Sequence, residues 1–157
     1  MPEIIPEHDT ESNQFLHGQS LKASLLLLPY YGASAVSIMV PYLVRGELLK
    51  SILALPDTIK VKIYTRDKRG YLPNIKDEAQ PAIELLKKKR NIQIFIDNRI
   101  HAKIWMVDEK IAIVHSMNGT RHSENFNLEA GIMTNSKRIL KEIVDFFKLS
   151  EGQAVKL

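Results

Sequence analysis

The chain has 157 residues, enough for one domain that buries about 70% of its unfolded surface. It contains no cysteine, which excludes disulfide bonds and thiolate metal sites and leads us to expect a reducing, cytoplasmic location. The net charge of +4 is uneven, because residues 1–20 hold acidic side chains and no Lys or Arg, so the rest of the chain is basic and favours polyanionic partners such as nucleic acid.

Residues 1–18 are polar and acidic and show no hydrophobic periodicity, so we expect a flexible N-terminal lead followed by a single domain over residues 19–157. No basic start with an apolar stretch behind it is present, and the leucine run at 25–28 is too short to cross a bilayer. We therefore expect neither a signal peptide nor membrane association.

Beyond residue 18, hydrophobic spacing predicts helices and strands in alternation, then a hairpin whose tight turn holds Asp108 and Glu109. This order predicts an α/β layered fold, in which helices flank a mixed β-sheet. In chain order, the predicted elements are a helix at 19–28, a strand at 35–43 closed by Pro41, a helix at 46–54, a strand at 58–65, a basic loop at 66–73, a helix at 77–90, strands at 92–96, 100–107, 110–116 and 128–134, and a helix at 137–149.

Several chemically active side chains lie on the later predicted strands. His101 and Lys103 are two residues apart, so they share one face of their strand. Ser116 and Asn118 share a face in the same way if the next strand continues that far. If these two strands pair as a hairpin, the four groups converge at one edge of the sheet, where an imidazole, an ammonium and neutral donors can hold a tetrahedral oxyanion.

The spacing of these residues, with Asp108 between the two pairs, resembles the signature of the phospholipase D superfamily. Thr120 stands where the family often has threonine or serine, and Glu129 resembles the carboxylate of the family's downstream strand. The order of the preceding predicted strands and helix also agrees. The resemblance covers about residues 20–150 and implies a phospholipase D-like layered fold.

The resemblance implies hydrolysis of a phosphodiester in two displacements, without a metal ion or other cofactor. One His101 attacks phosphorus to give a phosphohistidine, and the His101 of a second copy protonates the leaving oxygen and then activates water. Lys103 neutralises the phosphate, Ser116 and Asn118 fix it, and Glu129 holds the far nitrogen of His101. Because the chain has one copy of the motif, the resemblance implies a homodimer with a composite site on its two-fold axis.

One residue departs from the family's pattern, since His115 stands where the family usually has glycine. We expect its side chain to face away, because it has the opposite strand parity to Ser116. Asp108 is expected to have a structural role in its turn. The further candidate substrate contacts are Arg66, Lys68 and Arg69 in the basic loop, Trp105, His115 itself, and His122 in the loop after the motif.

The leading prediction is a phosphodiester hydrolase, namely an endonuclease that acts on DNA or RNA. The basic body of the chain and the lack of an interfacial apolar element favour nucleic acid over lipid. Two alternatives stay open on the sequence. One is a non-catalytic phospholipase D-like module for nucleic-acid binding or dimerisation, which the His115 departure favours, and the other is a phospholipase acting on lipid phosphodiesters.

Overall fold

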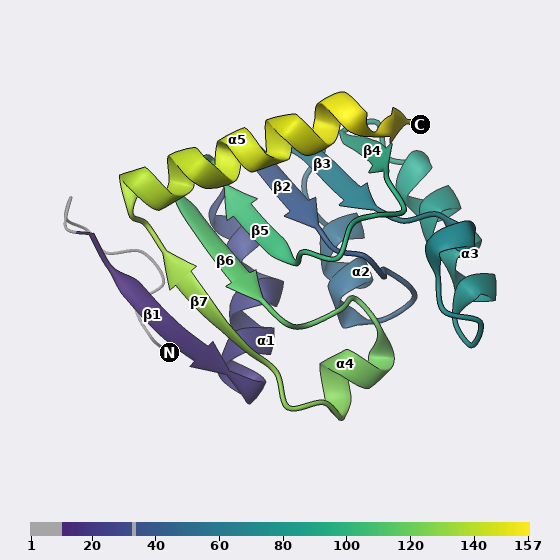
Figure 1. The fold of residues 1–157 in the computed structure, drawn as a ribbon, viewed down its shortest axis with the longest axis horizontal. Coiled ribbons are helices and arrows are strands. Elements are labelled where there is room, and N and C mark those ends of the chain that lie inside the picture. The colour runs from purple at the N-terminus through teal and green to yellow at the C-terminus, as the bar shows by residue number, and fades with distance from the viewer. Residues whose placement is uncertain (1–10, 33) are drawn as a thin grey trace.

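The structure is a computed structural model that describes residues 11–32 and 34–157, and its strands form one sheet (Figure 1). The helices and strands alternate as the sequence predicts. The strands are β1 (Asn13–His17), β2 (Ala35–Met39), β3 (Lys60–Thr65), β4 (Ile92–Ile96), β5 (Ile104–Val107), β6 (Ile111–His115), β7 (Ala130–Thr134) and β8 (Val155–Lys156). The helices are α1 (Gly18–Leu27), α2 (Glu47–Leu53), α3 (Lys76–Lys87), α4 (Arg121–Asn125) and α5 (Lys137–Gln153), with short 3-10 helices η1 (Leu28–Tyr31) and η2 (Lys68–Gly70).

The sheet is mixed, with the strand order β1-β7-β6-β5-β2-β3-β4-β8. The β2–β3 and β3–β4 pairs are parallel, as helical crossover connections require, and the other neighbours are antiparallel. The hairpin of β5 and β6 is confirmed. The predicted α/β class with a mixed sheet is therefore correct.

Helices cover both faces of the sheet, because successive strand side chains point in opposite directions. Ile38 and Ile63 belong to the larger core, which α1, α2 and α3 cover. Met39 and Tyr64, the next residue on each strand, belong to a second core on the face that α5 crosses, where Phe147 packs against them. Figure 1 shows α5 in front of the sheet with α1 and α2 behind it. In the described part of the chain no helix is both long and apolar enough to span a bilayer.

The predicted N-terminal lead contains a strand. Residues 1–10 lie outside the described residues, but Asn13–His17 form β1, which pairs antiparallel with β7 at one side of the sheet. Leu16 provides the reason, because its side chain is buried in the larger core while its neighbours are exposed. One buried leucine and the backbone hydrogen bonds to β7 are enough to hold this strand in the sheet. The prediction of a flexible lead is therefore wrong for these residues.

The strands that carry the motif are shorter than predicted. β5 begins only at Ile104, and four residues before it the Ile100 carbonyl accepts a hydrogen bond from Arg66 Nε (2.6 Å). β6 ends at His115, whose N–H donates to the Lys103 carbonyl (3.0 Å). The motif side chains therefore lie on loop segments just beyond the strand ends, not on the strand faces that the sequence suggested.

One edge of the sheet collects these loops, since β2, β3 and β6 end there and β5 and β7 begin there. The turn of Asp108 and Glu109 lies at the opposite edge, with both residues in the left-handed region at φ 51° and 54°. Asp108 Oδ1 accepts hydrogen bonds from the N–H groups of Ser34 (3.1 Å) and Ala35 (2.8 Å). These contacts give Asp108 a structural role, which ties the turn to the start of β2.

Candidate active site

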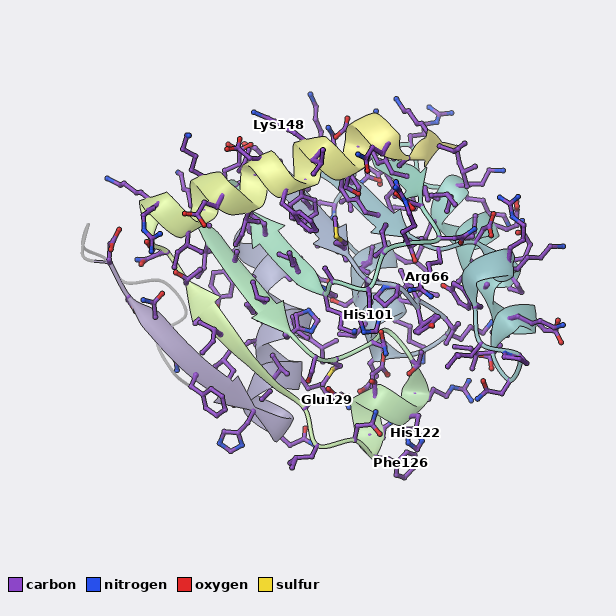
Figure 2. All side chains as sticks on the ribbon, in the orientation of Figure 1. Arg66, His101, His122, Phe126, Glu129 and Lys148 are labelled. Carbon is purple, nitrogen blue, oxygen red and sulfur yellow. The ribbon has the colours of Figure 1, made fainter. Side chains whose placement is uncertain are left out.

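His101 and Lys103 lie on the loop that leads into β5. Figure 2 shows His101 at the sheet edge, in the same region as Arg66 and Glu129. The His101 side chain is exposed, whereas Lys103 is half-buried and its Nζ donates to the His101 carbonyl oxygen (2.9 Å). The loop thus presents an accessible imidazole beside a cation that is fixed by its own backbone.

Ser116 and Glu129 form a pair across the ends of β6 and β7. The Ser116 N–H donates to the Ala130 carbonyl (3.0 Å), and the Ala130 N–H donates to Ser116 Oγ (3.1 Å). The Ser116 hydroxyl in turn donates a hydrogen bond to Glu129 Oε2. Ser116 therefore fixes Glu129, and its hydroxyl proton is already committed within the protein.

Ser123 on α4 completes this network, although the sequence analysis did not single it out. Its buried hydroxyl donates to Glu129 Oε1 (2.8 Å) and accepts from the backbone N–H of Asn118 (3.1 Å). Thr120 caps α4 by accepting from the Ser123 N–H (3.3 Å). Threonine is a preferred residue at a helix start, but no local sequence signal marks the contact between Ser123 and Glu129.

Glu129 has different partners from those that the family resemblance implied. Both oxygens of its buried carboxylate accept from hydroxyl groups, those of Ser116 and Ser123. Within residues 11–32 and 34–157, no hydrogen bond joins Glu129 to His101. The carboxylate lies where it organises the loops after β6 and before β7, and its negative charge partly opposes the lowering of the Lys103 pKa by burial. Its role here is to support the site and balance a cation.

Asn118 lies at the centre of the loop between β6 and α4. This loop is fixed to the segment after β2, because the Gly119 N–H donates to the Tyr42 carbonyl (2.8 Å) and the Gly119 carbonyl accepts from Val44 (2.8 Å). The Asn118 side-chain Oδ1 is buried and has no hydrogen-bond partner among the described residues. A buried polar atom left without a partner is uncommon and often marks a ligand site.

Arg66 supplies a second fixed cation. Its guanidinium donates to the carbonyl of Ile100 (2.6 Å), the carbonyl of Gly70 (3.1 Å) and the Tyr42 hydroxyl (3.2 Å), and it stacks on the Tyr42 ring at 5.2 Å. Burial lowers the pKa of Lys103, and the nearby charge of Arg66 lowers it further, while Glu129 opposes both. Lys103 and Arg66 carry two positive charges against the one negative charge of Glu129, so this edge of the sheet favours the binding of an anion.

The other two residues of the predicted basic cluster differ from Arg66. Arg69 is exposed, and its guanidinium is paired with the carboxylate of Asp67 at 2.7 Å. That ion pair raises the pKa of Arg69 and lowers that of Asp67. Lys68 is exposed on η2. Of the three predicted phosphate contacts, only Arg66 is therefore held beside the motif.

His115 has its ring beside that of Trp105, a residue of the larger core. Its ring is buried, and burial together with the positive charge of Lys103 lowers its pKa to about 3, so the ring is neutral. Nδ1 accepts from the Met117 N–H (3.1 Å), which assigns the proton to Nε2. Gly131 is the cross-strand neighbour of His115, and an added Cβ there would lie 2.8 Å from that of His115, so the two strands approach closely at this point.

Trp105 and His122 take positions that the sequence left open. Trp105 is a buried core residue with its ring edge towards His115, at a centroid distance of 6.5 Å, so it lies behind that ring and does not line a substrate pocket directly. His122 is exposed on α4, where its ring packs against Phe126. In the described part of the chain, no three His, Cys, Asp or Glu side chains form a group able to hold a metal ion.

Taken together, the edge offers an exposed imidazole, two fixed cations and an amide with free bonding capacity. Such a set can hold a tetrahedral anion while the imidazole acts as a nucleophile or acid. A phosphate group fits this description, because its charge and its several acceptor oxygens match the donors that converge here.

Comparisons with known proteins agree with this geometry. No curated protein matches the chain significantly. Among solved structures, NucT from Helicobacter pylori has a TM-score of 0.79 at 15% identity, covering 94% of this chain and 100% of that chain. Nuc from Salmonella typhimurium, a phospholipase D family member, has a TM-score of 0.80 at 16% identity, with coverages of 94% and 99%. TrmBL2, an archaeal chromatin protein, reaches 0.63 at 17% identity, with coverages of 96% and 56%.

At these identities the structural likeness establishes the fold alone. The family comparison goes further, because the model described as "cardiolipin synthase, PLD-like domain" matches residues 33–149. That range is well over half of the chain and includes the whole segment from His101 to Glu129. The chain belongs to the phospholipase D superfamily.

Proposed function

We propose that the protein is a metal-independent phosphodiester hydrolase, a nuclease that cleaves DNA or RNA within the strand. The observation that carries this proposal is the exposed His101 imidazole beside Lys103, Arg66 and the Asn118 amide at one edge of the sheet. The basic body of the chain favours nucleic acid as the substrate. The similarly folded TrmBL2 is described as binding DNA, which supports the same choice over lipid.

The reaction proceeds in two displacements at phosphorus. In the first, a neutral His101 nitrogen forms a bond to phosphorus while the bond to the leaving oxygen breaks, and the partner subunit's His101 gives that oxygen its proton. In the second, water attacks phosphorus, the phosphorus–nitrogen bond breaks, and the partner subunit's His101 accepts the proton of the water. The products are one hydroxyl end and one phosphate monoester.

The other residues stabilise charge and geometry in this scheme. Lys103 and Arg66 face the nonbridging oxygens, whose negative charge grows in the transition state. The Nδ2 group of Asn118 donates to one of those oxygens, because the Oδ1 end of the amide can only accept. Ser116 and Ser123 hold Glu129, so that the carboxylate balances the cations without approaching the phosphate.

Two copies of the chain are needed, because one chain supplies one motif histidine. The structure offers a surface for the second copy on the sheet face that α5 leaves uncovered over β1, β7 and β6 (Figure 1). There Phe15, Ile132 and Val114 are neighbours across the strands and are 64%, 44% and 43% exposed. This row lies beside the edge that carries His101, so a two-fold axis nearby brings the two imidazoles together.

Incubation with single- and double-stranded DNA and RNA in excess chelator tests the function. We expect the wild type to cleave at least one of these nucleic acids, and His101→Ala to lose activity by roughly a thousandfold or more, since it lacks the nucleophile. Lys148→Gln, which alters an exposed side chain on α5, is the control and is expected to keep activity.

Three results would contradict the proposal. Equal cleavage by the wild type and His101→Ala would remove the histidine mechanism. Binding of nucleic acid without any cleavage would favour the non-catalytic module, which the buried His115 in place of the family's usual glycine would then explain. Turnover confined to lipid phosphodiesters would favour a phospholipase.

A further inference from the structure

Two aromatic rings stand exposed beside the candidate active site. Phe126 follows α4 directly and is 76% exposed, and its ring lies 5.6 Å from that of the exposed His122, tilted by 37°. Figure 2 shows both rings at the sheet edge that carries His101 and Glu129, pointing away from the body of the protein. A single exposed apolar side chain is common on protein surfaces. Its placement is what calls for an explanation here.

The element that carries these rings is firmly anchored. The buried Glu124 carboxylate accepts hydrogen bonds from the first N–H groups of α2, those of Glu47 (3.0 Å) and Leu48 (3.1 Å). On the other side of α4, Lys22 Nζ donates to Asn125 Oδ1 (3.3 Å). The Phe126 N–H donates to the His122 carbonyl (2.9 Å), which fixes the backbone between the two rings. The rings are therefore presented in a set position and do not hang from a loose loop.

The same helix is part of the phosphate-handling network. Ser123, the neighbour of His122, bonds to both Glu129 and the Asn118 backbone. Arg121, at the start of α4, is exposed and forms no ion pair within the described residues. An aromatic face, a solvent-facing cation and the phosphate site thus lie within a few residues of one another, which is the combination that binds single-stranded nucleic acid.

We propose that Phe126, backed by His122, is a stacking platform for an unpaired nucleobase of the substrate, so that the enzyme prefers single-stranded over double-stranded nucleic acid. This inference rests on the proposed nuclease function. A phenyl face stacks with any base, but the bases of a duplex already stack on one another and offer no free face. The platform therefore selects strand state and not sequence.

Binding measured by fluorescence anisotropy tests the platform without interference from cleavage, if all variants carry His101→Ala. The probes are one labelled single-stranded oligonucleotide, the same strand with abasic sites throughout, and its duplex. Phe126→Ala is expected to weaken binding of the single strand roughly tenfold or more, which is the usual effect of losing one stacked base. Phe126→Trp is expected to restore this binding. The protein that carries only His101→Ala (the parent) should bind the abasic strand about as weakly as the Phe126→Ala variant binds the normal strand.

Phe146→Ala is the matched control, because Phe146 is a partly exposed phenylalanine on α5, away from α4, and its loss is expected to leave binding unchanged. Parent-like binding of the single strand by Phe126→Ala overturns the platform while leaving the nuclease function intact. An equal loss on the duplex and the single strand also overturns it. A shift of Phe126→Ala to monomers in sedimentation would instead place the ring in a protein interface. Failure of the wild type to cleave any nucleic acid, together with failure of the parent to bind any, overturns the nuclease function itself.

Discussion

His115 shows how burial can fix the charge state of one side chain. Its imidazole is buried beside the ring of Trp105. Once buried beside Lys103, the ring has a pKa of about 3 and stays neutral. It therefore adds no third positive charge beside Lys103 and Arg66. A charged side chain at this position would compete with these two cations for the negative charge of the phosphate.

This burial predicts a specific dependence of stability on pH. Below pH 6.5 the unfolded chain takes up a proton on His115 that the folded chain accepts only near pH 3. The free energy of unfolding therefore falls as pH drops through this window, by about 1.4 kcal/mol per pH unit from this one group. In His115→Gln that contribution is absent. The free energy of unfolding, measured by urea unfolding across this window, should therefore change less steeply with pH than in the wild type, by about 1.4 kcal/mol per pH unit. Parallel curves for the two proteins would contradict the burial of a neutral ring.

Ser123 is a positioning residue, since it touches Glu129 and the Asn118 backbone but not the reacting atoms. Ser123→Ala is expected to lower kcat about tenfold with little change in KM, because a loosened Asn118 costs roughly 1.4 kcal/mol in the transition state. Ser24→Ala is the matched control, as Ser24 is equally buried but donates only to the Ser20 carbonyl within α1. Equal kinetics for Ser123→Ala and the wild type would show that the network does not act on the site.

The helices and strands were largely predictable, and the errors have physical causes. The clean alternation around Ile63 predicted β3, and the turn at Asp108 predicted the β5–β6 hairpin. The strand ends were not predictable. The segment before β5 is held by the hydrogen bond from Arg66 to the Ile100 carbonyl, which is a contact between segments distant in the sequence. β1 was missed because its only buried anchor is Leu16, between exposed neighbours.

The spacing of the motif residues predicted that they lie at one end of the sheet, and their catalytic roles stay predictions, but the hydrogen-bond partners of Glu129 were not predictable from that spacing. The order of the strands decides that Glu129 faces the hydroxyls of Ser116 and Ser123. No local pattern contains that information. The domain boundary near residue 19 and the cytoplasmic location stay predictions from composition.

At the scale of elements, the contact between α4 and α2 predicts a non-additive pair of substitutions. Gly46 has φ 173°, an extended conformation open to any residue, but an added Cβ would lie 2.6 Å from Glu124 Oε1. Gly46→Ala should therefore lower the free energy of unfolding by about 1–3 kcal/mol in the wild type. In a Glu124→Ala background the obstructing carboxylate is gone, so the same change should cost far less. Urea unfolding of the four proteins gives the coupling, and identical costs in both backgrounds would contradict the contact.

At the scale of the whole molecule, the fold brings residues from five separate loops to one edge of one sheet. It leaves an apolar row of Phe15, Ile132 and Val114 uncovered beside that edge. If the proposed reaction needs two histidines, the single chain combines half of a site with an uncovered apolar face. Both features have one explanation if two copies pair and each supplies one imidazole to a shared site.

A heterodimer with only one intact imidazole tests this central claim most directly. Wild-type and His101→Ala chains carrying different affinity tags can be co-expressed and purified on both tags in turn, and their cleavage rate compared with that of each homodimer. The account predicts a rate close to that of the His101→Ala homodimer, because the shared site needs both histidines. Activity near about half that of the wild type would show that each chain works alone, and recovery of the wild type as a monomer with full activity would contradict the account outright.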